Sequence, residues 1–158
     1  MLKALFLPLL LSTTATTAQT DCAKPVIRLL HNGQEISSAV GSALVPSVTL
    51  QVAPEAGCPE QRYRFRNAEV TLIRKGRPAL PSLKVSQPQL DLRYFLNHYI
   101  PGDYLFVFIA YQNVALVSGD CSLTPLRSLK DAKSNPGQLD LRTDDAKGIS
   151  FRWPLQKP

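Results

Sequence analysis

The sequence predicts an all-β protein, an immunoglobulin-like antiparallel β-sandwich of about seven strands, and three observations lead to this fold class. Apolar residues alternate with polar ones in several short segments, as at Val48, Leu50 and Val52, and this is the period of a half-buried strand. Turn signals, such as the Asn-Gly pair at residues 32–33, separate these segments. No segment combines helix caps with a sustained helical period, and only residues 93–99 are expected to form a helical turn.

The individual strands follow from the same pattern in chain order. A bulge is expected near Asn67, where the apolar positions change parity. The motif at residues 101–104, Pro-Gly-Asp-Tyr, resembles the corner of immunoglobulin-like domains that a tyrosine hydroxyl ties to the backbone. Residues 104–111 are apolar on both parities, which predicts a central strand covered on both faces. Pro154 should keep the last strand near a sheet edge. The expected strands lie at residues 26–30, 48–52, 63–72, 83–85, 90–92, 104–111 and 149–155.

The first eighteen residues have the layout of a secretory signal peptide. A short basic start precedes an apolar run at residues 4–11, and small polar residues then lead to Ala18. The run is much shorter than the ~20 residues that cross a bilayer. We therefore expect residues 1–18 to be removed and residues 19–158 to form one exported domain, located in the periplasm, at the cell surface or outside the cell.

Three cysteines, Cys22, Cys58 and Cys121, would enter an oxidising compartment on export. They allow one intramolecular disulfide with one thiol left over. Loop entropy separates the three possible pairings by less than ~1 kcal/mol, so the pairing stays open. We expect the spare thiol to be a buried small side chain rather than an intermolecular bridge. Lipidation of Cys22 is not expected, because the acidic Asp21 precedes it.

The main irregular part of the chain is expected at residues 118–148. Gly, Asp, Asn and Pro residues there are typical of loops. Leucines in its first half could dock a short helix, and residues 139–141 could add an edge strand. Long connections in compact domains are usually functional or disordered. We expect a decoration packed on the sandwich, with a binding loop as the alternative.

Enzyme chemistry has little support in the sequence. Serine-hydrolase, P-loop, zinc-protease and C-x-x-C motifs are absent. His31 and His98 fall in expected connections, and exposed loop positions explain them more simply than a Cys–His nucleophile does. The acidic residues Asp140, Asp144 and Asp145 lack the glycine and the terminal glutamate of a calcium loop. We expect no catalytic residue, cofactor or metal, and a small Cys- or His-dependent hydrolase remains the least favoured hypothesis.

The chain carries 18 Lys and Arg against 12 Asp and Glu, and two groups of its basic residues stand out. Arg62, Arg64 and Arg66 share one parity, so a regular strand would place their side chains on one face about 7 Å apart. Such a face can meet phosphate, an anionic polysaccharide or an acidic protein partner. Nucleic acid is not expected for an exported protein. A second basic group follows at the next turn and comprises Arg74, Lys75 and Arg77.

Residues 65–78 carry an aromatic entry, a Val-Thr-Leu strand and a basic residue with glycine at the hairpin. This part of the chain resembles the periplasmic C-terminal region of the gliding-motility protein GldM and its secretion homologue PorM. The likeness continues through residues 90–92 and 101–103, and residues 148–152 are similar to that region's last strand. In all it extends over about residues 63–155. The resemblance implies an immunoglobulin-like module without catalysis, from a family of elongated envelope dimers that couple an inner-membrane motor to type IX secretion and gliding.

The chain also departs from that family. We expect a cleavable leader where the family has a cytoplasmic start and a transmembrane helix, and no counterpart of the family's long stack of preceding domains. Force transmission from the inner membrane is therefore not implied. We expect a non-enzymatic protein–protein interaction module of the bacterial envelope that docks to an envelope protein or to a second copy. Its expected contact regions are the 74–77 hairpin, the 118–148 segment and any unpaired sheet edge. The alternative is a secreted binder of anionic glycan or lipid through the 62–66 face.

Overall fold

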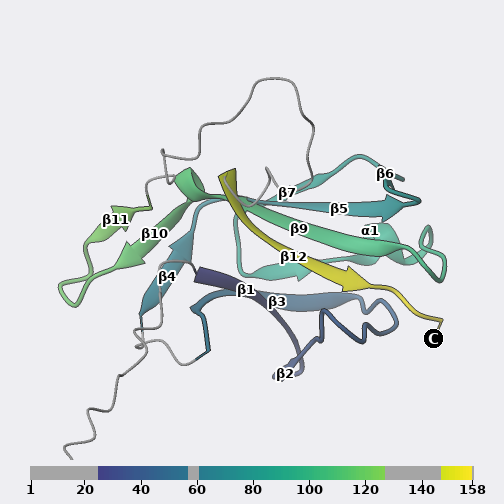
Figure 1. Ribbon diagram of the computed structural model, residues 1–158, viewed down its shortest axis with the longest axis horizontal. Coiled ribbons are helices and arrows are strands. Elements are labelled where there is room, and N and C mark those ends of the chain that lie inside the picture. Colours follow the sequence, from purple (N-terminus) through teal and green to yellow (C-terminus); the bar gives the residue numbers. More distant parts are fainter. Residues whose placement is uncertain (1–24, 57–60, 127–146, 158) are drawn as a thin grey trace, which may run out of the picture.

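The computed structural model describes residues 25–56, 61–126 and 147–157, and these fold into three antiparallel sheets (Figure 1). The prediction of an all-β, sandwich-like fold is confirmed. The described residues form twelve strands rather than about seven, because several are only two to four residues long. The elements are β1 (Pro25–His31), β2 (Gln34–Glu35), β3 (Ser47–Pro54), β4 (Arg62–Phe65), β5 (Ala68–Arg74), β6 (Arg77–Pro78), β7 (Leu83–Val85), β8 (Gln89–Asp91), α1 (Arg93–Leu96), β9 (Tyr104–Ala110), the 3-10 turn η1 (Tyr111–Asn113), β10 (Val114–Val117), β11 (Leu123–Pro125) and β12 (Gly148–Pro154).

The first sheet has the strand order β2-β1-β3-β8, and the second has the order β12-β9-β5-β6 with β7 also paired to β5. In Figure 1, β1 and β3 lie below β12, β9 and β5. The third sheet, β11-β10-β4, lies at one end of these two layers. The Asn-Gly turn between β1 and β2 forms as expected, with positive φ angles at Asn32 and Gly33. The predicted helical turn is α1, and the predicted edge position of the last strand is that of β12.

The core lies between the first two sheets and is built from the alternating positions that the sequence marks as apolar. Leu29 of β1, Leu50 of β3 and Leu72 of β5 are almost fully buried. Trp153 of β12 is 0% exposed, and its indole N–H donates a 3.0 Å hydrogen bond to the Ser42 hydroxyl. These strands therefore each contribute a buried face to a common core, as period-two patterning requires.

Strand β9 differs from its prediction on one face. Leu105, Val107 and Ile109 are fully buried, but the opposite face with Phe106 and Phe108 is only half-buried. The apolar residues of both parities therefore reflect one core face and one outer aromatic face, and the expectation of two covered faces was wrong.

The predicted bulge near Asn67 is a place where two sheets separate. Strand β5 pairs with β9, whereas β4 pairs with β10, so the two-stranded ribbon passes from the second sheet into the third. The extra residues lie on the facing strand, in the η1 turn. Across this interruption the Arg66 N–H still donates to the Asn113 carbonyl at 2.7 Å. The buried positions do change parity here, and the change occurs where the ribbon bends from one sheet into the other.

Several expectations fall wholly or partly outside the described residues. These are the leader at residues 1–18, Cys22, Cys58, the acidic cluster at residues 140–145 and the expected edge strand at residues 139–141. Within the irregular segment, β11 pairs with β10. Cys121 is exposed and is not in a disulfide, which contradicts a buried position for this thiol. No helix among the described residues is long and apolar enough to span a membrane.

Candidate interaction site

The structure separates the two predicted groups of basic residues. Arg62, Arg64 and Arg66 lie on and just after β4, whereas Arg74, Lys75 and Arg77 lie at the β5–β6 hairpin in a different sheet. The two groups therefore form two separate surfaces, and they differ in how many of their cations are available to a partner.

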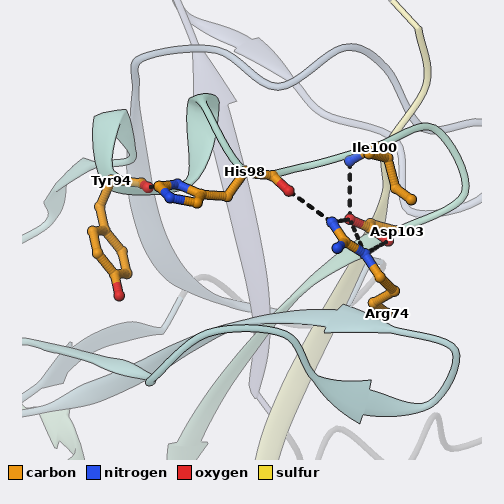
Figure 2. A network of polar contacts seen from close by, with 5 residues as sticks. All are labelled: Arg74, Tyr94, His98, Ile100 and Asp103. Carbon is orange, nitrogen blue, oxygen red and sulfur yellow. Dashed lines mark hydrogen bonds and ion pairs between the residues drawn. The ribbon is translucent and has the colours of Figure 1, made fainter.

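Arg74 is already used inside the fold (Figure 2). Its guanidinium donates three hydrogen bonds to the Asp103 carboxylate, from Nε at 3.1 and 3.3 Å and from Nη2 at 2.9 Å. Nη2 also donates to the His98 carbonyl at 2.6 Å. Asp103 accepts a further hydrogen bond from the Ile100 N–H at 3.0 Å. These four residues connect the β5–β6 end of the second sheet to the turn that precedes β9. The guanidinium of Arg74 is therefore not available to a partner, and Arg74 does not belong to the binding group that the sequence predicted.

The same network replaces the predicted tyrosine corner. The side chain of Asp103 is 2% exposed, while that of Arg74 is 37% exposed. Burial alone would raise the pKa of Asp103, but the hydrogen bonds and charge of Arg74, with the Ile100 amide, lower it below its ordinary value. Tyr104 packs outward instead, with the Arg152 guanidinium 3.9 Å from its ring centroid. The corner is held by a carboxylate one residue before the expected tyrosine.

The rest of the hairpin remains open to solvent. Lys75 and Arg77 are exposed, and Lys75 and Gly76 both have positive φ angles in the two-residue turn. A shallow hollow of about 490 Å³ lies beside them. The hairpin therefore presents two available cations rather than three.

The arginines of β4 follow their prediction closely. Arg62, Arg64 and Arg66 are exposed, whereas Tyr63 and Phe65 between them are half-buried and pack against the core. In the described parts of the chain, the acidic partners in ion pairs are Glu35, Asp91 and Asp103, and none of them pairs with a β4 arginine. One face of β4 thus carries a row of cations without described counter-charges.

A groove of about 810 Å³ lies between β3 and β4. Its walls include Val52 of β3 and the whole of β4, and Val117 and Cys121 also line it. None of its described lining residues is acidic. The groove is therefore a mostly apolar trough with Arg62 and Arg64 along one wall.

The wall formed by β4 is an unpaired strand edge. Arg66 N–H donates to Asn113 on the β10 side, and main-chain groups of successive residues point to opposite sides of a strand. The N–H and C=O groups of Tyr63 and Phe65 therefore point away from β10, toward the groove. No strand among the described residues pairs with β4 on that side.

The wall formed by β3 is also unpaired over part of its length. Leu50 N–H donates to the Pro88 carbonyl at 2.7 Å, and the pairing of β3 with β8 ends at Thr49. By the same alternation, the N–H and C=O of Val52 point to this side, beyond the end of β8. Two strand edges without a partner among the described residues thus border one groove.

The chain matches no protein-family model, no curated protein and no solved structure at a significant level. The features that bear on the function are therefore the groove and the charged residues along it.

The remaining predicted residues lie elsewhere. The His31 ring contacts the Ser47 carbonyl at 3.2 Å, and the His98 ring contacts the Tyr94 carbonyl at 3.0 Å. No group of three His, Cys, Asp or Glu residues that could hold a metal occurs in the described part of the chain. Sequence reasoning missed the groove itself, and the only signal that bears on it is the alternation of arginine and aromatic residues in β4.

Proposed function

We propose that the protein is a non-enzymatic, exported interaction module that binds another protein through the groove between β3 and β4. The observation that carries this proposal is the combination of two strand edges and several exposed arginines that have neither a pairing strand nor an acidic partner among the described residues. Unpaired edges offer main-chain donors and acceptors to an incoming chain, and such edges are a recurring mode of peptide recognition.

A location in the bacterial envelope is part of the same proposal. It rests on the leader-like layout of residues 1–18 and on the resemblance of residues 63–155 to the GldM and PorM region. The resemblance also suggests work near the type IX secretion or gliding machinery, as a docking module rather than a force-transmitting shaft. The partner would accordingly be an envelope protein.

The exposed arginine row supports a second candidate function. A secreted protein with this face could bind an anionic glycan or lipid, because such ligands need closely spaced cations and no main-chain pairing. Binding of that kind weakens steeply with salt, since it depends on screened charges.

Affinity capture with matched charge variants tests the proposal. The tagged protein is used to capture partners from crosslinked envelopes of its own host, in parallel with Arg62→Glu/Arg64→Glu and with Lys75→Glu/Arg77→Glu, which changes the net charge by the same amount. The groove variant should recover at least about tenfold less of a stoichiometric envelope protein, because charge reversal at a contact opposes docking. The hairpin variant should recover as much as the wild type.

Two results would count against the proposal. If the hairpin variant loses the partner and the groove variant keeps it, the binding site is the 75–77 turn. If only polyanions are recovered, and a moderate-salt wash removes them, the anionic glycan or lipid binder replaces the protein-binding module.

A further inference from the structure

We infer that the ligand of the groove is an extended acidic segment of the partner protein, which pairs with β4 as an added strand of the third sheet. This inference rests on the proposed function and specifies what the groove recognises. It follows from three features of the described residues: the direction of the β4 main-chain groups, the side-chain pattern of β4 and the effect of charge on self-pairing.

The main chain of β4 sets the conformation of the ligand. The N–H and C=O groups of Tyr63 and Phe65 are directed into the groove, two residues apart. Only an extended chain presents acceptors and donors at the matching spacing, since a strand repeats its orientation every second residue. A helix or a compact loop would leave these groups unpaired.

The side chains of β4 set the sequence of the ligand. On one face of the strand, Arg62 and Arg64 are exposed, and on the other face Tyr63 and Phe65 pack toward the core. Side chains directly opposite each other on neighbouring strands lie about 4.5–5.5 Å apart, so opposite charges stabilise the pairing and like charges oppose it. The segment should therefore carry Asp or Glu at every second position, with apolar residues between them.

The same arginines argue against a second copy of the protein as the ligand. Pairing β4 with β4 of another molecule would place exposed arginines of both chains along one short ribbon. Charged residues on edge strands are a common way of preventing such self-association. The protein should accordingly remain monomeric at low salt, and dimerisation through this edge would contradict the inference.

Synthetic peptides test the inference with the full-length protein. The probe is a fluorescent peptide of about eight residues, an ordinary strand length, in which Glu alternates with Val. The first control peptide has the same sequence but carries N-methyl groups on alternate amides, so that it keeps every charge and loses the donors on one edge. The second has the same composition with its Glu residues clustered. Binding is followed by fluorescence anisotropy at low salt and at about 0.15 M salt.

The alternating peptide should bind at both salt concentrations. The peptide methylated on the amides that face β4 should bind at least about tenfold more weakly, because strand pairing needs those donors. The clustered peptide should also bind more weakly, because its charges cannot meet arginines two residues apart. Equal binding of all three peptides would overturn the inference in favour of simple charge attraction.

Two matched variants of Tyr63 test the same contact from the protein's side. Tyr63→Ala and Tyr63→Pro both lose the aromatic ring, but only the proline also loses the N–H that points into the groove. Proline is tolerated at an edge position of this kind, where the N–H makes no pairing with the neighbouring strand. If both variants keep their β-sheet circular dichroism, Tyr63→Pro should bind the alternating peptide at least about fivefold more weakly than Tyr63→Ala. Equal affinities would contradict added-strand pairing.

Failure of this inference can be told apart from failure of the proposed function. If Arg62→Glu/Arg64→Glu abolishes capture of the envelope partner while no alternating peptide binds, the groove binds a protein but not as an acidic strand. If capture is unaffected by the groove variant, the proposed function itself fails at this site.

Discussion

Replacing Trp153 with alanine is expected to lower the free energy of unfolding by about 4 kcal/mol, within the usual range for removing a large aromatic side chain from a core. Trp153 is fully buried in β12, between the first two sheets. The substitution removes more buried surface than any other single change to alanine in this core, and it leaves the Ser42 hydroxyl without its indole donor. For a chain of this length, the midpoint of thermal unfolding should fall by roughly 10 °C or more.

The measurement is thermal and urea unfolding followed by far-ultraviolet circular dichroism, because Trp153 is the only tryptophan and its fluorescence is lost in the variant. Trp153→Phe is the control, since it refills most of the volume and should cost clearly less. Ser42→Ala tests the hydrogen bond alone and should cost about 1–2 kcal/mol, because the buried indole N–H loses its acceptor. An unchanged midpoint in Trp153→Ala would mean that β12 does not close the core.

Replacing Asp103 with asparagine is expected to destabilise the protein by about 2 kcal/mol at neutral pH. The substitution removes the charge that holds Arg74 and weakens the acceptor of the Ile100 amide. The loss of stability should be smaller than for a fully buried ion pair, because the Arg74 side chain is 37% exposed and its charge is partly screened. The loss should appear as a lower urea midpoint with little change in the denaturant slope.

The effect of Asp103 should disappear in acid. The folded pKa of this carboxyl lies below its ordinary value. A lowered folded pKa stabilises the protein above the unfolded pKa of about 3.9, and that stability is lost as pH falls through the folded value. The difference in stability between wild type and Asp103→Asn should therefore be largest above about pH 5 and shrink steadily below about pH 4.

Asp91→Asn is the matched control for this pair. The Arg93 guanidinium and amide lower the pKa of Asp91 to about 2, but both side chains are mostly exposed. A surface pair of this kind contributes little to stability. The variant should unfold with the wild type within experimental error, and a loss as large as that of Asp103→Asn would show that burial is not the deciding factor.

The parts of the fold that could be predicted from sequence are those fixed by local pattern. Alternation located β3 and β12, and the Asn-Gly pair located the turn after β1, because period-two burial and turn chemistry depend only on near neighbours. The expectation for β9 failed on one face, because apolar composition cannot distinguish a second buried face from an outer aromatic one. A change of parity near Asn67 was predicted as a bulge of this strand, whereas the extra residues lie in the η1 turn on the facing side, which the local pattern does not reveal.

The candidate site was also predictable only in part, because local sequence pattern does not reveal contacts between distant segments. The exposed face of Arg62 and Arg64 follows from parity along β4. The ion pair that occupies Arg74 does not follow from this parity. Its partner Asp103 lies 29 positions away, and the contact depends on how two strands are placed. The groove is harder still to predict, because it depends on how β3 and β4 are placed and on their lack of pairing with one another among the described residues. The basic residues that could bind a partner were identified from the sequence, but their positions in the folded protein determine which of them a partner can reach.

The position of β12 has a consequence for how a newly made chain survives. Strand β9, the most apolar segment of the sandwich, is paired on one side by β5 and on the other by β12. Residues 148–154 are synthesised well after residues 104–110, so the β12 side of β9 is open during that interval. An open edge rich in Phe, Val and Ile is a typical starting point for aggregation. Any nascent or truncated chain that ends before Gly148 would therefore be expected to depend on chaperones until this edge is closed.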